Sequence, residues 1–111
     1  MTHQMKLQSA PFLAIKSGRK KIEMRLFDEK RSLIKVGDMV EFTDVKTGEK
    51  LLCTVVNMHR YPTFADLYAN HTKEEIGYTE GEQADPADML AYYSQEEIAR
   101  YGVVGIELTL L

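Results

Sequence analysis

The strongest constraint on the fold is an alternating segment inside the most highly charged part of the chain. Within residues 17–31, SGRKKIEMRLFDEKR, nine of the thirteen residues from 19 to 31 are charged. Apolar side chains nevertheless recur at every second position there, at Ile22, Met24 and Leu26. This spacing matches the side-chain period of a β-strand and predicts a strand over 20–26 with its apolar face on the core. The opposite face would carry Lys21, Glu23 and Arg25.

The remaining sequence predicts a mixed succession of strands and short helices. Strand-like patterns occupy residues 5–8, 35–44, 50–58 and 103–111, and helical patterns occupy residues 10–17, 63–71 and two short segments after Asp85 and Ser94. The strands at 35–44 and 50–58 flank a short turn and should form a β-hairpin. An apolar strand that returns after the helices indicates a closed or strongly bent sheet. The expected fold is therefore α+β: a small mixed β-barrel with several short helices, in one domain over 1–111.

Capping residues support the predicted helix boundaries. Ser9 is the expected N-cap of the first helix, and Gly18 falls where a helix end favours a positive φ. Ser94 and Glu97 form an S-x-x-E capping box, and Gly102 follows the helix that it opens.

Charge is distributed unevenly along the chain, whose formal net charge is −3. Residues 1–61 contain twelve Lys and Arg against seven Asp and Glu, whereas residues 62–111 contain two against ten. This asymmetry predicts a surface with a basic side that attracts anions, unless the two halves interleave in the fold and mix their charges.

Several classes of site and location are not expected. The three histidines lack ligand spacing among themselves or with Cys53, so we expect no metal site, and no cofactor motif is present. Cys53 lies in an apolar run and is expected in the core. The chain shows no signal-peptide pattern and no apolar run long enough to cross a membrane, so a cytoplasmic location without membrane association is expected.

The charged face of the predicted strand is the candidate functional site. Glu23 would lie roughly 7 Å along the strand from Lys21 and from Arg25, an acceptor between donors. Lys20 lies at the junction of helix and strand, where Gly18 would let the backbone approach a ligand closely. We therefore predict ligand binding by five residues: Gly18, Lys20, Lys21, Glu23 and Arg25.

This arrangement suits a nucleobase with a nearby phosphate. Lys20 and Glu23 are also candidates for an acid–base pair in catalysis. The alternative is a solvated strand face with cross-strand ion pairs. Tyr92 or Tyr93 would either cover a cleft or pack in the core.

The segment from Gly18 to Arg25 resembles the G-x-K-x-x-E-x-R motif of the ASCH domain, a family of small β-barrels related to PUA domains. Residues 26–42, 59–67 and 92–108 also resemble the stretches that follow this motif in compact family members, so the resemblance covers nearly the whole chain. It implies binding of RNA or nucleotides in a cleft beside the motif strand.

Some compact ASCH proteins are amidohydrolases that remove the acetyl group of N4-acetylcytidine. They use a motif lysine, a threonine three positions later and a distant glutamate. Lys20 matches the lysine, but Glu23 stands at the threonine position, and Glu74 or Glu75 is the nearest match for the glutamate. The sequence thus predicts an RNA- or nucleotide-binding domain. A hydrolase acting on a modified nucleoside or RNA, and a domain that binds another protein, remain as alternatives.

Overall fold

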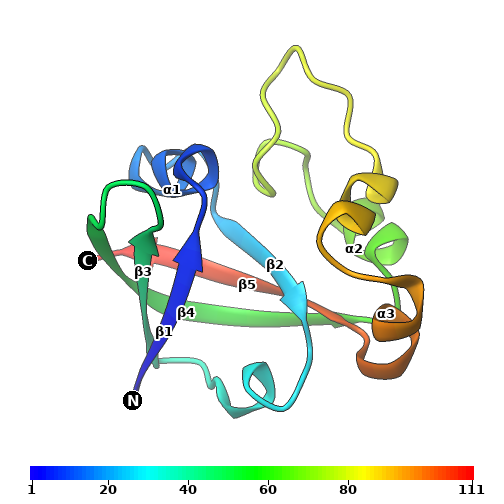
Figure 1. Ribbon diagram of the computed structural model, residues 1–111, viewed down its shortest axis with the longest axis horizontal. Helices are drawn as coiled ribbons and strands as arrows, with labels where there is room; N and C mark the ends of the chain where they lie inside the picture. Colours follow the sequence, from blue (N-terminus) through cyan, green and yellow to red (C-terminus); the bar gives the residue numbers. More distant parts are fainter.

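The five strands form one curled sheet in the order β1-β3-β4-β5-β2. A computed structural model describes all 111 residues. The elements follow one another as β1 (Thr2–Leu7), α1 (Ser9–Lys16), β2 (Ile22–Leu26), the 3₁₀ turn η1 (Arg31–Leu33), β3 (Met39–Asp44), β4 (Lys50–Tyr61), α2 (Phe64–Asn70), the 3₁₀ helix η2 (Pro86–Ala91), α3 (Gln95–Tyr101) and β5 (Val103–Leu110). The expected α+β barrel-like fold is confirmed as a half-barrel, open between β1 and β2 (Figure 1).

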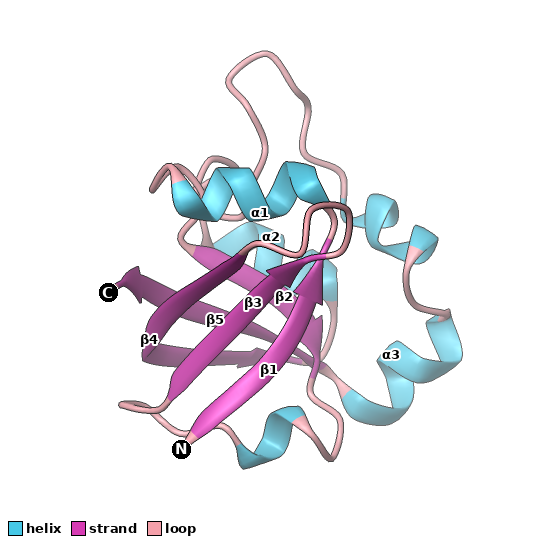
Figure 2. Cartoon of the chain, turned by 60° about the vertical axis from the view of Figure 1, so that its left-hand side comes forward, coloured by secondary structure: helices cyan, strands magenta, loops and turns pink.

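Strand pairing explains the curl. β1 pairs in parallel with β3, and the predicted hairpin is present as the antiparallel pair β3–β4. β4 is long enough to continue past β3 and pair with β5, with a bulge between Val55 and Asn57. β5 pairs in turn with β2, so the last strand of the sequence lies inside the sheet. Figure 2 shows α1 lying across one end of the strands and α3 standing apart at the side.

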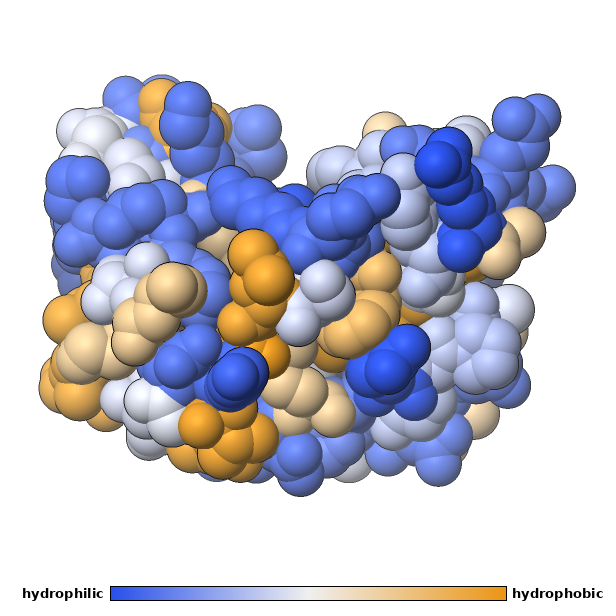
Figure 3. Space-filling view, turned by 90° about the horizontal axis from the view of Figure 1, so that it is seen from below, coloured by the Kyte–Doolittle hydropathy of each residue, from blue (hydrophilic) through white to orange (hydrophobic).

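Two apolar clusters lie on opposite faces of the sheet. The inner cluster joins β1, α1, β3, β4 and β5 around Phe12 and Phe42, which are fully buried. The outer cluster joins β2 to α2 and η2 around Ile22, Leu67 and Met89. On the face seen from below, polar side chains predominate and apolar ones form separate spots (Figure 3). None of the helices combines the length and apolar character needed to span a membrane.

Two local predictions need correction. The strand begins at Ile22 rather than at residue 20, because the backbone N–H groups of Lys21 and Ile22 donate to the Glu75 carbonyl outside the sheet. Gln8, not Ser9, is the N-cap of α1, since the Ser9 hydroxyl donates to Asp44 instead.

The predicted apolar face of β2 is confirmed, because Ile22, Met24 and Leu26 are buried in a core cluster, and the structure adds where each face of β2 points. Its apolar face packs on the outer cluster beneath the helices, whereas Glu23 and Arg25 lie directly opposite Ile106 and Val104 on the inner face. The charged face of the strand therefore points into the half-barrel, and both faces of β2 are covered.

Candidate functional site: a cleft at the open seam

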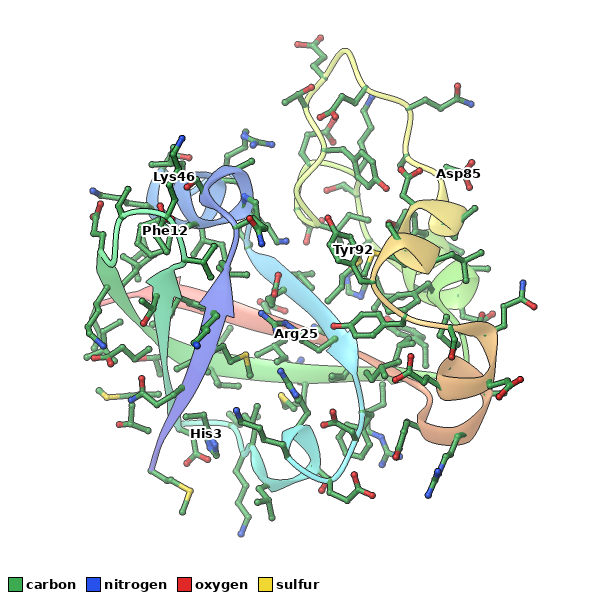
Figure 4. All side chains as sticks on the ribbon, viewed as in Figure 1. His3, Phe12, Arg25, Lys46, Asp85 and Tyr92 are labelled. Carbon is green, nitrogen blue, oxygen red and sulfur yellow. The ribbon has the colours of Figure 1, made fainter.

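A cleft of about 620 Å³ lies at the opening between β1 and β2. β1 and β2 are the two edges of the sheet and do not pair with each other. Their side chains line the cleft together with the segment that follows α2 and runs through η2. In Figure 4, Arg25 lies between β1 and β2, and Tyr92 lies across from it on the η2 side.

Glu23 is held between two cations on the floor of this cleft. Its Oε1 lies 2.9 Å from Lys20 Nζ, and its Oε2 accepts from Arg25 Nε at 2.7 Å. Only 4% of Glu23 and 8% of Lys20 are exposed. Because both carboxylate oxygens are engaged, Glu23 fixes the positions of the two cations.

The charge state of Glu23 depends on two opposing effects, its burial and its two cationic neighbours. Burial alone would raise the pKa of its carboxyl, because it penalises the charged form. The adjacent charges of Lys20 and Arg25, with their hydrogen bonds, outweigh burial and lower the pKa of Glu23 below its ordinary value of 4.5. Glu23 is therefore a carboxylate at neutral pH, and the group of three carries one net positive charge.

Arg25 also joins the two edge strands. While its Nε donates to Glu23, its terminal nitrogen donates to the backbone carbonyl of Lys6 on β1 at 2.9 Å. One guanidinium thus spans the seam that backbone hydrogen bonds leave open.

Lys20 owes its position to a glycine in the 72–84 loop. Gly77 has a φ of +115°, and a β-carbon there would lie 3.0 Å from Cδ of Lys20. Arg19 fastens the same loop by donating to the carbonyls of Gly77 and Tyr78 at 2.9 and 3.2 Å. The loop therefore confines the lysine stem and leaves its ammonium group beside Glu23.

Tyrosines and an aspartate form the opposite wall of the cleft. The Tyr68 hydroxyl donates to that of Tyr78 over 2.8 Å, and the Tyr78 hydroxyl donates to Asp88 Oδ2 at 2.7 Å. Burial is the main cause that raises the pKa of both tyrosines, so both keep their protons at neutral pH. Tyr93 stacks on Phe64, whereas Tyr92 is 69% exposed at the rim.

The two walls come from the two halves of the sequence. Lys6, Arg19, Lys20 and Arg25, all from the basic half, are the cations that line the cleft. The acidic half contributes Glu82 and Asp88 together with the tyrosines. The charge asymmetry therefore becomes a contrast across the cleft, between a mainly basic side and an acidic, aromatic one, and Arg19 joins the two through the Gly77 and Tyr78 carbonyls.

The structure brings together three of the five candidate residues. Lys20, Glu23 and Arg25 line the cleft, while Gly18 and Lys21 line a smaller depression of about 350 Å³ beside β5, which Lys20 also borders. Glu74 and Glu75 do not line the cleft, and the Glu75 carboxylate accepts from the Thr72 hydroxyl instead. No group of three or more His, Cys, Asp or Glu side chains is placed to hold a metal ion.

Sequence reasoning missed Tyr68, Tyr78 and Asp88. Tyr68 lies on α2, Asp88 lies on η2, and Tyr78 lies in the irregular loop between them, so spacing along the chain gives no sign that they meet. The one available signal was composition, since aromatic and acidic residues are concentrated after residue 61.

Comparisons with known proteins agree with this architecture. The family model described as the ASCH domain matches residues 5–111. No curated protein matches the chain. Among solved structures, the chain is similar to a hypothetical protein designated PH0355, with 32% identity, a TM-score of 0.87 and full coverage of both chains.

Two further structures are similar. The protein PF0455 from Pyrococcus furiosus has 33% identity and a TM-score of 0.77, covering 100% of this chain and 98% of that one. A mutant of ZmASCH from Zymomonas mobilis has 12% identity and a TM-score of 0.63, covering 97% of this chain and 67% of that one, and supports the fold alone. With its motif strand, its half-barrel and a family match over almost its whole length, this chain belongs to the ASCH domain family.

Proposed function

We propose that residues 1–111 act as one RNA- or nucleotide-binding domain, with the ligand held in the cleft at the open seam. The observation that carries this proposal is the pair of cations, Lys20 and Arg25, fixed by a buried carboxylate and facing a wall of tyrosines. Membership of a family commonly thought to bind RNA supports it.

The size and polarity of the cleft suit one nucleotide unit. Ligand pockets usually measure about 300–1,000 Å³, and this one measures about 620 Å³. Cations on one side attract phosphate, and aromatic side chains on the other offer stacking surfaces for a base. A single-stranded segment or free nucleotide fits these features better than a duplex, whose bases are already stacked.

Each candidate residue has a distinct part in this proposal. Arg25 and Lys20 contact phosphate oxygens, and Glu23 keeps both in place. Gly18 and Lys21 lie in the adjoining depression, where they would meet only an RNA strand that extends beyond the cleft.

The test is a thermal-shift screen of nucleotides and short single-stranded RNAs, followed by binding isotherms at several salt concentrations. A ligand at 100 times its dissociation constant should raise the free energy of unfolding by about 2.7 kcal/mol. Arg25→Ala should weaken binding and lower the slope of log affinity against log salt by about 0.7 for a single strand.

Arg60→Ala is the matched control, because Arg60 packs over the Phe27 ring outside the cleft. It should leave affinity and salt slope near those of the wild type. If no nucleotide or RNA stabilises the protein, or if both variants weaken binding equally, the proposal fails.

The hydrolase alternative has less support. Glu23 replaces the threonine of the deacetylating relatives, and its carboxylate is already bonded to Lys20 and Arg25. We therefore expect little release of acetate from N4-acetylcytidine by the purified protein. Robust release that is lost in Lys20→Ala would favour the enzyme.

A further inference from the structure

We propose that the cleft selects nucleotides whose base carries an exocyclic amino group, and that Asp88 is the acceptor that reads this group. The proposal rests on the proposed function above and assigns base selection to a residue outside the family motif.

Three carboxylates line the cleft: Glu23, Glu82 and Asp88. Glu23 is only 4% exposed and each of its oxygens is bonded to a cation, so a base has little access to it. Glu82 Oε1 accepts from the Thr79 backbone N–H at 2.7 Å and closes a local turn. Asp88 differs from Glu82 in position, because it lies on η2 just before Tyr92 and Tyr93 and bonds to the Tyr78 hydroxyl of the same wall, so we assign the contact with a ligand to Asp88.

Asp88 is held in a defined orientation. Its Oδ2 accepts from the Tyr78 hydroxyl, which in turn accepts from the Tyr68 hydroxyl. Asp85 sets the start of η2 by capping the Ala87 N–H at 2.9 Å, so the turn that carries Asp88 is fixed as well. The other oxygen of Asp88, Oδ1, takes part in no hydrogen bond within the chain and remains available as an acceptor.

The surroundings of Asp88 define what it would accept. Tyr92 offers an exposed ring at the rim of the same cleft, and Tyr93 is anchored behind it by stacking on Phe64. A base stacked on Tyr92, with its phosphate toward Arg25, would direct a polar edge to this wall. A carboxylate accepts from an amino group such as cytosine N4, but it repels the carbonyl oxygen that replaces this group in uracil.

The experiment compares two matched ligand pairs, cytidine and uridine monophosphate and adenosine and inosine monophosphate. Each pair differs by an amino group against a carbonyl, while the phosphate stays the same. The wild type should bind the amino member at least about five-fold more tightly, the lower limit for a good base contact. The ratio within each pair is the readout, because removing a carboxylate also changes the affinity for every anion.

Asp88→Asn keeps the shape and still accepts from Tyr78, but it can turn an amide donor toward the base. It should reduce both ratios to about one or invert them. Glu82→Gln, the same charge change in the same cleft, should leave both ratios unchanged. Tyr78→Phe should reduce the ratios partly, because it frees Asp88 to rotate.

The outcomes separate the two proposals. If nucleotides bind but the wild type shows no preference within either pair, or if Asp88→Asn keeps the wild-type ratios, the base-selection proposal is overturned and the proposed function stands. If no nucleotide binds to the wild type, the base-selection proposal is overturned, and if no short single-stranded RNA binds either, the proposed function is overturned with it. Melting curves of each variant verify that the fold is intact.

Discussion

Glu23 shows how one buried carboxylate can position the cations that line a cleft. A buried carboxylate with one cation would form a pair of zero net charge, which would attract anions poorly. With two cations, Lys20 and Arg25, the charge is compensated in excess and both donors are held in place. Such a buried network is expected to fix a geometry more than to add stability, because desolvation offsets much of the attraction.

Removing the centre of this network should nevertheless be costly. Glu23→Ala should lower the free energy of unfolding by about 3–5 kcal/mol, because it leaves two buried cations facing each other without a counter-charge. Chemical denaturation measures this change. Glu49→Ala removes the partner of Lys16 in an exposed ion pair and should have a much smaller effect. Equal losses in the two variants would mean that the Glu23 network contributes no more than a surface ion pair.

At the scale of elements, the 72–84 loop matters because it lacks regular structure yet is fastened at several points. Arg19 holds its carbonyls from one side, and the Glu75 carbonyl accepts from both Lys21 and Ile22. These bonds tie the loop to the start of β2 and place the Lys20 side chain against Gly77. The loop is thus part of the cleft wall.

Gly77→Ala should therefore disturb both folding and binding. The positive φ and the 3.0 Å approach to Lys20 Cδ predict a loss of about 1–3 kcal/mol in the free energy of unfolding. Ligand affinity should fall too, because the lysine stem must move. Gly81→Ala in the same loop meets no atom within 4 Å and should change stability by less than about 0.5 kcal/mol. Similar melting temperatures for the two variants would contradict this account.

Several of these elements could be predicted from the sequence, and others could not. The capping box at Ser94 and the hairpin could be predicted because each depends on residues close in the chain. The period of β2 was readable, but its orientation was not, because alternation reveals two faces without revealing which one meets the sheet interior. The chain Tyr68–Tyr78–Asp88 depends on tertiary approach and has no local pattern.

For the whole molecule, the division of charge along the chain becomes a division across one cleft. Four cations from residues 1–61 face two carboxylates from residues 62–111. Such a cleft favours a ligand that carries an anionic group at one end and a hydrogen-bond donor at the other. Because Glu23 is buried at this cleft, protonation of its carboxylate should also change the stability of the entire fold.

Acid should destabilise the protein in two stages. Burial, aided by His59, lowers the pKa of His71, so the unfolded chain takes up a proton first as pH falls below about 6.5 and stability declines. The lowered pKa of Glu23 stabilises the fold above 4.5, and this contribution is lost as pH falls through its folded pKa. Urea unfolding between pH 3 and pH 7 should show both stages in the wild type. Glu23→Gln should reduce the pH dependence of the more acidic stage only. If the free energy of unfolding of the variant and of the wild type changed in parallel over that pH range, Glu23 would be excluded as the source of this stage.

The single guanidinium across the seam has a consequence for motion. Backbone hydrogen bonds attach β1 to the sheet along one edge, and only Arg25 reaches its other edge. The N–H groups of β1 that point into the seam have no strand partner, so their amide protons should exchange with solvent far faster than those of β4, which has partners on both sides. The N-terminal strand is then the part of the half-barrel that can detach first, and a ligand phosphate competing for Arg25 would change how often it does so.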